Sequence, residues 1–331
     1  MITRRNLGAA GLALAAPALS GRGFVKGAAA QETYPARAVS MVVPWPPGGP
    51  TDTFARVLAG KLSEDAGRPF VVDNRGGANG TIGMAQAARA RPDGYTVVLA
   101  PNSTYAVAPH LYQVPYNQER DFVGAGLLAS SPLFMLVPKS SPARTVAEYV
   151  ELVKAAPRGR KVYANAGVGA TSHLATELFL QMAGIEVTEV GYRGGGPAIQ
   201  GVLAGEADMV FMPGASVMSF VASGDLRALA NTTPTRSPFA PDVPTFEELG
   251  YRGFEVTENL GLMAPTGTPA PILERLNALC RTALSAPALK PRLDALTVTP
   301  DVRPVAEWNA YAAAESRKWG DFVRARNIRV T

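Results

Sequence analysis

The chain has 331 residues, with 32 lysines and arginines against 27 aspartates and glutamates, which gives a formal net charge of +5. Four of the basic residues lie in the first 30 positions, so the rest carries 28 basic and 27 acidic side chains, or +1, without the basic stripe typical of nucleic-acid binding. One cysteine excludes an intramolecular disulfide, and two histidines without clustered carboxylates argue against a catalytic zinc site. We expect no cofactor.

The N-terminal segment has the pattern of an export signal. Paired Arg4 and Arg5 precede a mildly apolar stretch of glycine, alanine and leucine, and Ala28-Ala29-Ala30 offers a small-residue cleavage site. The apolar stretch is shorter than the ~20 residues of a membrane span, and its glycines and Pro17 disfavour an ordinary amphipathic helix. We therefore predict that residues 1–30 are a cleaved signal for export to the periplasm. The twin arginine resembles a Tat signal, with the Sec route as the alternative.

Short apolar runs alternate with segments of helical spacing along the remaining chain. The predicted strands are 39–43, 70–72, 96–100, 133–137, 162–164, 187–190, 208–212, 226–230 and 260–264. The predicted helices are 52–62, 146–155, 173–183, 197–204, 216–222, 271–284 and 305–325. This alternation predicts an α/β fold with mostly parallel sheets, and about 300 residues favour two domains.

Two predicted strand-to-helix junctions have the composition of ligand-binding loops. The first is VVPWPPGGPTD at residues 42–52, where Thr51 or Asp52 is the expected helix cap. The second is YANAGVGATSH at residues 163–173, which leads into a helix that Gly184 ends. Ligands of open α/β sheets bind beyond the carboxyl ends of strands, and helix N-termini favour anions. Each junction alone is equally explained as a tight turn, but the pair favours an anion-binding site.

Other motifs do not support a nucleotide site or an enzyme. The second junction lacks the third glycine of a dinucleotide fingerprint, because Ser172 stands there, and the glycines after Arg193 lack the ending of a P-loop. The chain has no Gly-x-Ser-x-Gly elbow. Asp52, His173 and Asp208 are the only candidate bases near the expected cleft, and no spacing pairs them into a catalytic dyad. An exported enzyme acting on a carboxylate stays the minor alternative.

Further motifs follow one another along the chain. They are YP (34–35), the first junction, VDNRGGANGTIG (72–83), PDGY (92–95), SHLATELF (172–179), YRGGGPA (192–198), GEAD (205–208), LRALA (226–230), RSP (236–238), PDVPT (241–245) and GLMAP (261–265). In this order they cover essentially the whole chain after the signal. They resemble the substrate-binding proteins of tripartite tricarboxylate transporters, the Bug receptors.

The resemblance implies a two-lobed Venus-flytrap fold of the periplasmic binding proteins, type II-like, with crossing strands as the hinge. Lobe 1 is expected at residues 31–128 plus 256–331, and lobe 2 at residues 129–255. It further implies a non-catalytic, monomeric receptor that holds a small carboxylate between the lobes and delivers it to integral membrane transporter subunits. The alternative partner is a signalling receptor to which the protein presents its ligand.

The resemblance also places the ligand contacts. In the first loop they are Trp45, Gly48, Gly49, Thr51 and Asp52, and in the second loop Asn165, Gly169, Thr171, Ser172 and His173. Weaker candidates are Asn79, Asn102, Ser103, Tyr192 and Asp208. Where relatives often have a small polar residue, this chain has Met212-Pro213-Gly214. We therefore expect an apolar wall at the distal end of the site, and a ligand with a hydrophobic or aromatic distal part.

Overall fold

The computed structural model describes residues 34–330, and the predicted export signal lies outside the described residues. Ten strands occur in this range: β1 (Val39–Val43), β2 (Phe70–Asn74), β3 (Thr96–Pro101), β4 (Phe122–Pro138), β5 (Val162–Asn165), β6 (Thr188–Gly191), β7 (Met209–Pro213), β8 (Leu226–Asn231), β9 (Thr257–Pro265) and β10 (Thr299–Pro300). They hydrogen-bond in the order β2-β1-β3-β9-β4-β7-β5-β6, and β8 and β10 pair with β4.

The helices follow the strands closely along the chain. They are α1 (Pro50–Ala66), α2 (Thr81–Ala88), α3 (Ala108–Leu111), α4 (Gln118–Asp121), α5 (Val146–Ala155), α6 (Thr171–Ala183), α7 (Gly195–Leu203), α8 (Gly214–Ala222), α9 (Ala270–Leu284), α10 (Lys290–Ala295) and α11 (Val305–Ala325). Three short helical turns complete the set: η1 (Ala78–Gly80), η2 (Ser103–Val107) and η3 (Pro287–Leu289). None of the helices in residues 34–330 combines the length and apolar character that a membrane crossing requires.

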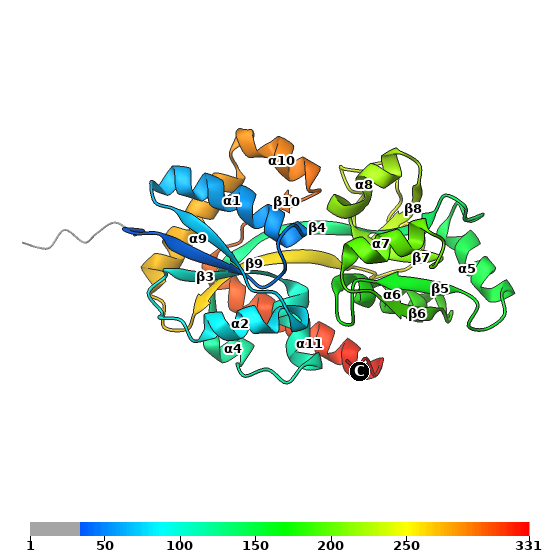
Figure 1. Ribbon diagram of the computed structural model, residues 1–331, viewed down its shortest axis with the longest axis horizontal. Coiled ribbons are helices and arrows are strands. Elements are labelled where there is room, and N and C mark those ends of the chain that lie inside the picture. The colour runs from blue at the N-terminus through cyan, green and yellow to red at the C-terminus, as the bar shows by residue number, and fades with distance from the viewer. Residues whose placement is uncertain (1–33, 331) are drawn as a thin grey trace, which may run out of the picture. The chain divides into compact units, whose positions relative to one another are not determined.

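Parallel pairs occur in two groups of strands. β1 pairs with β2 and β3, and β5 pairs with β6 and β7, all in parallel. The strands that join the groups, β4 and β9, pair antiparallel with each other and with their neighbours β3, β7, β8 and β10. The expectation of mostly parallel sheets was therefore wrong, because these long strands run against both parallel groups. Figure 1 shows β4 and β9 running side by side from one group of strands to the other.

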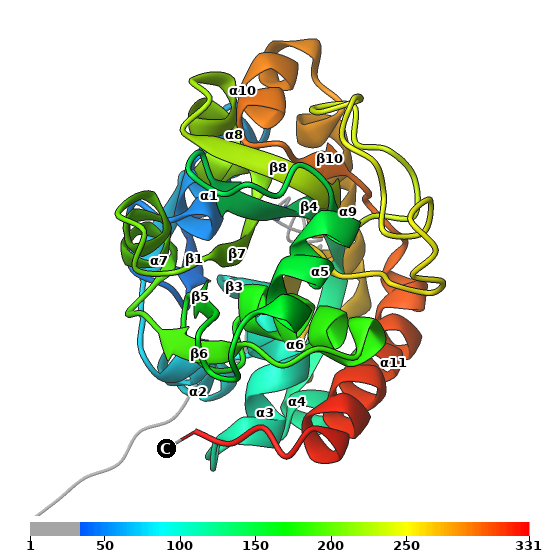
Figure 2. The ribbon, with the colours of Figure 1, turned by 90° about the vertical axis from the view of Figure 1, so that its right-hand side faces the viewer.

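Helices cover both faces of each group of strands. The apolar face of α1 carries Phe54, Leu58 and Leu62 at helical spacing, and they pack with α9 against β1 and β3. On the other face, α11 packs against η2 and α3 (Figure 2). Around β7, Phe179 of α6 and Phe211 pack in one aromatic cluster, while α7 and α8 cover the opposite face. Fully burying such side chains contributes about 1.5–3 kcal/mol each.

The predicted strands all occur, as do the seven predicted helices, with ends shifted by a few residues. The first half of β4 was not predicted, because its glycine, alanine and serine residues lack a strand pattern. The described residues 34–330 pack as one compact unit, so the two lobe boundaries stay a prediction.

Candidate functional site

The two junctions predicted from the sequence follow the carboxyl ends of β1 and β5. The first leads into α1 and the second into α6, and neither helix has a side-chain cap on its N-terminus. The expectation that Thr51 or Asp52 caps α1 was wrong, because Gly49 is the N-cap and both residues lie within the first turn. The first N–H groups of a helix have no intrahelical partner, so both ends present donors to an anion.

Asp52 stabilises the first junction from inside. Its carboxylate is buried and accepts hydrogen bonds from the Gly48 N–H at 2.8 Å, Asn74 Nδ2 at 2.9 Å and Arg56 Nε at 3.0 Å. Burial raises the pKa of the Asp52 carboxyl, but these hydrogen bonds outweigh it, and the pKa lies below its usual range. Asp52 therefore stays ionised and holds the loop, with its carboxylate already surrounded by donors of the protein.

Trp45 is fixed by a contact to a neighbouring element. Its indole Nε1 donates to Thr104 Oγ1 in η2 at 2.9 Å, and its ring packs beside the core that α1 and α9 enclose. The residue is partly exposed. Gly48 has φ +84, where a side chain would be strained, whereas Gly49 has ordinary backbone angles and space for a Cβ. Gly48 is exposed and Gly49 is partly exposed.

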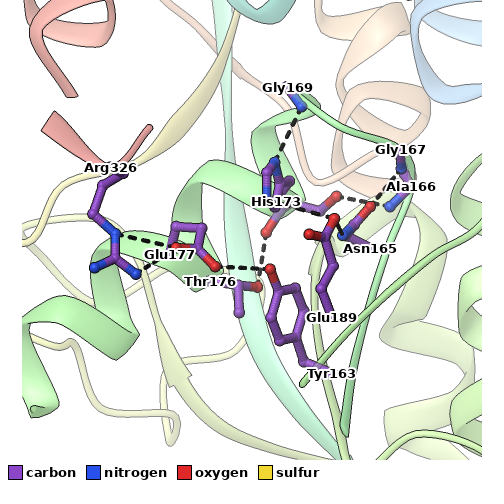
Figure 3. Close-up of polar contacts among 11 residues, drawn as sticks. Tyr163, Asn165, Ala166, Gly167, Gly169, His173, Thr176, Glu177, Glu189 and Arg326 are labelled. Atoms are coloured by element: carbon purple, nitrogen blue, oxygen red, sulfur yellow. Dashed lines mark hydrogen bonds and ion pairs between the residues drawn. The ribbon is translucent and has the colours of Figure 1, made fainter. Parts of the chain in front are cut away.

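The second junction is braced by its own side chains (Figure 3). The Asn165 Oδ1 accepts from the Gly167 N–H at 2.7 Å, and Ser172 Oγ accepts from the Ala166 N–H at 3.2 Å. His173 Nδ1 accepts from the Gly169 N–H at 3.1 Å. All three side chains are buried. They set the path of the loop and leave the first turn of α6 uncapped.

His173 is held as a neutral imidazole. Burial lowers its pKa, while Glu189 and Glu177 act in the opposite direction. The hydrogen bond from the backbone requires Nδ1 to be unprotonated, so the proton is on Nε2, which lies 3.6 Å from Glu189 Oε1. The ring also stacks on Tyr163 with centroids 6.4 Å apart. His173 thus supports the loop through its Nδ1.

A buried hydroxyl at the start of α6 has no partner. Thr171 is the first residue of the helix and is 4% exposed, and its Oγ1 makes no hydrogen bond within residues 34–330. An unpaired buried hydroxyl costs about 1–3 kcal/mol. It lies beside the free N–H groups of the same turn. The hydroxyl therefore keeps its capacity to donate and accept a hydrogen bond unused.

The two halves of the chain meet at the second loop. Asn79 Nδ2 donates to the Ser103 carbonyl at 3.2 Å and to the Gly169 carbonyl at 3.4 Å. Gly169 has φ +80, which strains any residue with a side chain, and a Cβ there would displace the end of the Leu111 side chain. Asn79, Ser103 and Gly169 thus come together at the second loop.

The other three weaker candidates do not join this group. Asn102 is buried and bonds to Asn259 N and the Thr257 carbonyl of β9, so it braces β3 against a crossing strand. The Tyr192 hydroxyl donates to Glu206, which places its ring over α7. Asp208 accepts from Lys161 Nζ and the Val162 N–H at the amino end of β5. That end lies about 10 Å from the loop after Asn165.

Sequence reasoning missed Glu258 in β9. Its side chain lines a small cavity with Pro50, Ser131, Pro213, Ala215, Leu260, Leu296 and Val298. Burial raises the pKa of its carboxyl to about 7. The feature of the sequence that could have indicated it is a charged residue within an otherwise apolar strand. Among residues 34–330, no three histidine, cysteine, aspartate or glutamate side chains gather as a metal ion would require.

Comparisons with known proteins agree with this architecture. The family model described as "Tripartite tricarboxylate transporter family receptor" matches residues 54–328. BugT of Bordetella pertussis is 37% identical over 297 residues, which cover 88% of this chain and 90% of BugT. A Pseudomonas protein from the tcbD-tcbE intergenic region is 39% identical over 281 residues, covering 84% of this chain and 81% of its own.

Solved structures give the same picture. The periplasmic binding protein BugD has a TM-score of 0.80 at 33% identity and covers 89% of this chain and 99% of its own. MatC of Rhodopseudomonas palustris, solved with bound malate, has a TM-score of 0.78 at 32% identity. The match covers 88% of this chain and 100% of MatC. An R. palustris protein solved with adipate has a TM-score of 0.82 at 30% identity. The match covers 89% of this chain and 99% of that protein. This chain therefore belongs to the receptors of the tripartite tricarboxylate transporter family, whose members have the two-lobed fold of periplasmic binding proteins.

Proposed function

We propose that this receptor binds one carboxylate group of a small ligand at the N-terminus of α6, opposite the N-terminus of α1. The observation that carries the proposal is the buried, unpartnered hydroxyl of Thr171 in the uncapped first turn of α6. Such a turn favours an anion through its free N–H groups and the positive end of the helix dipole. A carboxylate would satisfy the hydroxyl and these N–H groups together.

The related structures support this choice of ligand class. Two of them were solved with dicarboxylates, malate and adipate. The proposed contacts here are Gly48, Gly49 and Thr51 of the first loop, with Gly169 and Thr171 of the second. Trp45 and Asn79 border them, while Asp52, Asn165, Ser172 and His173 support the loops through the hydrogen bonds described above.

The proposed mechanism is capture by two lobes, residues 31–128 with 256–331 and residues 129–255. β9 pairs with β3 of one parallel group and β4 pairs with β7 of the other, so a bend in these two joining strands would move the lobes as units. A ligand that contacts both loops shifts the population toward the closed form. The receptor would act as a monomer in the periplasm after export by its N-terminal signal. It would deliver its ligand to membrane transporter subunits without chemical change.

A thermal-shift screen of the mature protein tests the proposal. A binder at about 100 times its dissociation constant adds about 2.7 kcal/mol to the free energy of unfolding. We expect hits among carboxylic acids that disappear for the matching amides. Equal shifts from an acid and its amide would contradict a carboxylate site.

Thr171 supplies the decisive variants. Thr171→Ala should weaken binding at least tenfold, and Thr171→Ser, which keeps the hydroxyl, should restore it. Thr176→Ala is the matched control, because this buried hydroxyl in the same helix already donates to the Ser172 carbonyl. Loss of binding in Thr176→Ala to the same degree would assign the effect to helix stability instead.

A further inference from the structure

Glu258 lies at the point where the crossing strands meet the starts of two helices. The cavity that it lines includes Pro50, the first residue of α1, and Ala215 near the start of α8. It also includes Pro213 at the end of β7, part of the segment expected to form an apolar wall. The cavity therefore adjoins the first loop of the carboxylate site, and its volume of about 10 Å³ is roughly that of one water molecule.

The cavity has one ionisable side chain in a lining that is otherwise almost entirely apolar. Of the residues that line it, Glu258 alone has an ionisable side chain, and Ser131 alone adds another polar side chain. The Ser131 hydroxyl already donates to the Thr297 carbonyl. The Glu258 carboxylate has no hydrogen bond or ion pair within residues 34–330. Glu258 is partly exposed in this otherwise apolar cavity, and a cation or strong donor from a ligand would interact favourably with its carboxylate.

Resting on the carboxylate site proposed above, we infer that Glu258 is a specificity residue that receives a cationic or hydrogen-bond-donating group at the other end of the ligand. A primary ammonium is close to a water molecule in size and supplies three donors. The ligand class is therefore an amino carboxylate with an apolar middle. A second carboxylate in this cavity would face Glu258 as a like charge and is selected against.

Matched ligand pairs test this inference. Isothermal titration at pH 8 would compare 4-aminobutanoate with succinate, 5-aminopentanoate with glutarate, and 6-aminohexanoate with adipate. Each pair keeps one carboxylate and the chain length, and exchanges only the distal group. The proteins are the wild type, Glu258→Gln and the control Glu255→Gln, whose exposed side chain lines a different groove.

In the wild type, we expect the amino acid of the best-fitting length to bind at least about tenfold more tightly than its dicarboxylate. Glu258→Gln should remove or reverse this preference, and Glu255→Gln should keep it. A preference for dicarboxylates in the wild type, or one unchanged in Glu258→Gln, would overturn the role of Glu258 while leaving the carboxylate site intact. Absence of binding by every acid in both this series and the wider screen would contradict the carboxylate site itself, and the inference with it.

Discussion

The side-chain amide of Asn79 donates to the backbone carbonyl of Gly169 at 3.4 Å and so links the loop before α2 to the loop before α6. The two residues are 90 positions apart in sequence. Asn79 has φ 51, a left-handed conformation that asparagine tolerates better than most residues. Gly169 has φ +80 and lies against Leu111. The second loop is therefore shaped by contacts from both halves of the chain.

Gly169→Ala should weaken both folding and binding. The new Cβ would meet Leu111 Cδ1 at 2.3 Å and would stand at a left-handed backbone position. We expect a loss of about 1–3 kcal/mol in the free energy of unfolding, because the Leu111 side chain has to move in addition to the backbone strain. Gly184→Ala is the matched control, because Gly184 is also left-handed but has open space around its Cβ position. Urea denaturation should show a loss of only about 1 kcal/mol in the control.

His173 should make stability depend on pH. Its pKa is lowered by burial, so the folded protein binds fewer protons than the unfolded chain near the ordinary value of about 6.5. The stabilising contribution is therefore present above pH 6.5 and is lost as the pH falls through the lower folded pKa. Protonation would also break the bond from the Gly169 N–H. Urea denaturation between pH 5 and 8 measures this loss.

His173→Gln should reduce this part of the pH dependence and weaken ligand binding at pH 8. His110 provides the comparison, since burial lowers its pKa as well, but its ring contacts Ser316 and Gly320 instead of the second loop. His110→Gln should leave binding at pH 8 unchanged. An equal effect of both substitutions on binding would contradict the loop-supporting role of His173.

The sequence predicted the local features of the site better than its contacts. Both glycine-rich loops follow the strands expected, since apolar strand runs and helical spacing are local signals. The contacts of Asp208 and Tyr192 could not be predicted from such local signals. Asp208 follows a loop, and only the parallel register of β5 and β7 places it at the amino end of the strands. Glu258 was missed because its cavity is formed by segments distant in sequence.

Arg326 should stabilise the docking of the C-terminal end of the chain on α6. Its guanidinium bonds to Glu177 Oε2 at 2.6 Å, and Glu177 is mostly buried and also accepts from the Tyr163 hydroxyl. Arg326→Ala would leave this carboxylate without its ionic partner, and we expect a loss of about 1–3 kcal/mol in the free energy of unfolding. Arg324→Ala is the control, because its pair with Asp321 is exposed and contributes below about 1 kcal/mol.

Glu258→Gln should stabilise the unliganded protein at high pH. Burial raises the pKa of this carboxyl from 4.5 to about 7, so between these values the folded state binds the proton more strongly than the unfolded chain. The wild type is therefore most stable, in this respect, below about pH 4.5 and loses stability as the pH rises through 7. Glutamine cannot ionise and avoids that loss. Urea denaturation should give the variant an advantage on the order of 2 kcal/mol at pH 8, shrinking toward pH 4.5.

The same urea denaturation series shows whether the Glu258 carboxylate lacks a partner or is already paired with a cation of the protein. If the protein itself supplied a cation to Glu258, the Glu258→Gln substitution would destabilise the protein at pH 8, opposite to the expected sign. A saturating amino carboxylate should lower the pKa of the Glu258 carboxyl, because the ammonium favours the ionised form. The stability advantage of Glu258→Gln at pH 8 should then disappear in the presence of that ligand. An advantage that persists with the ligand bound would mean that the ammonium does not reach Glu258.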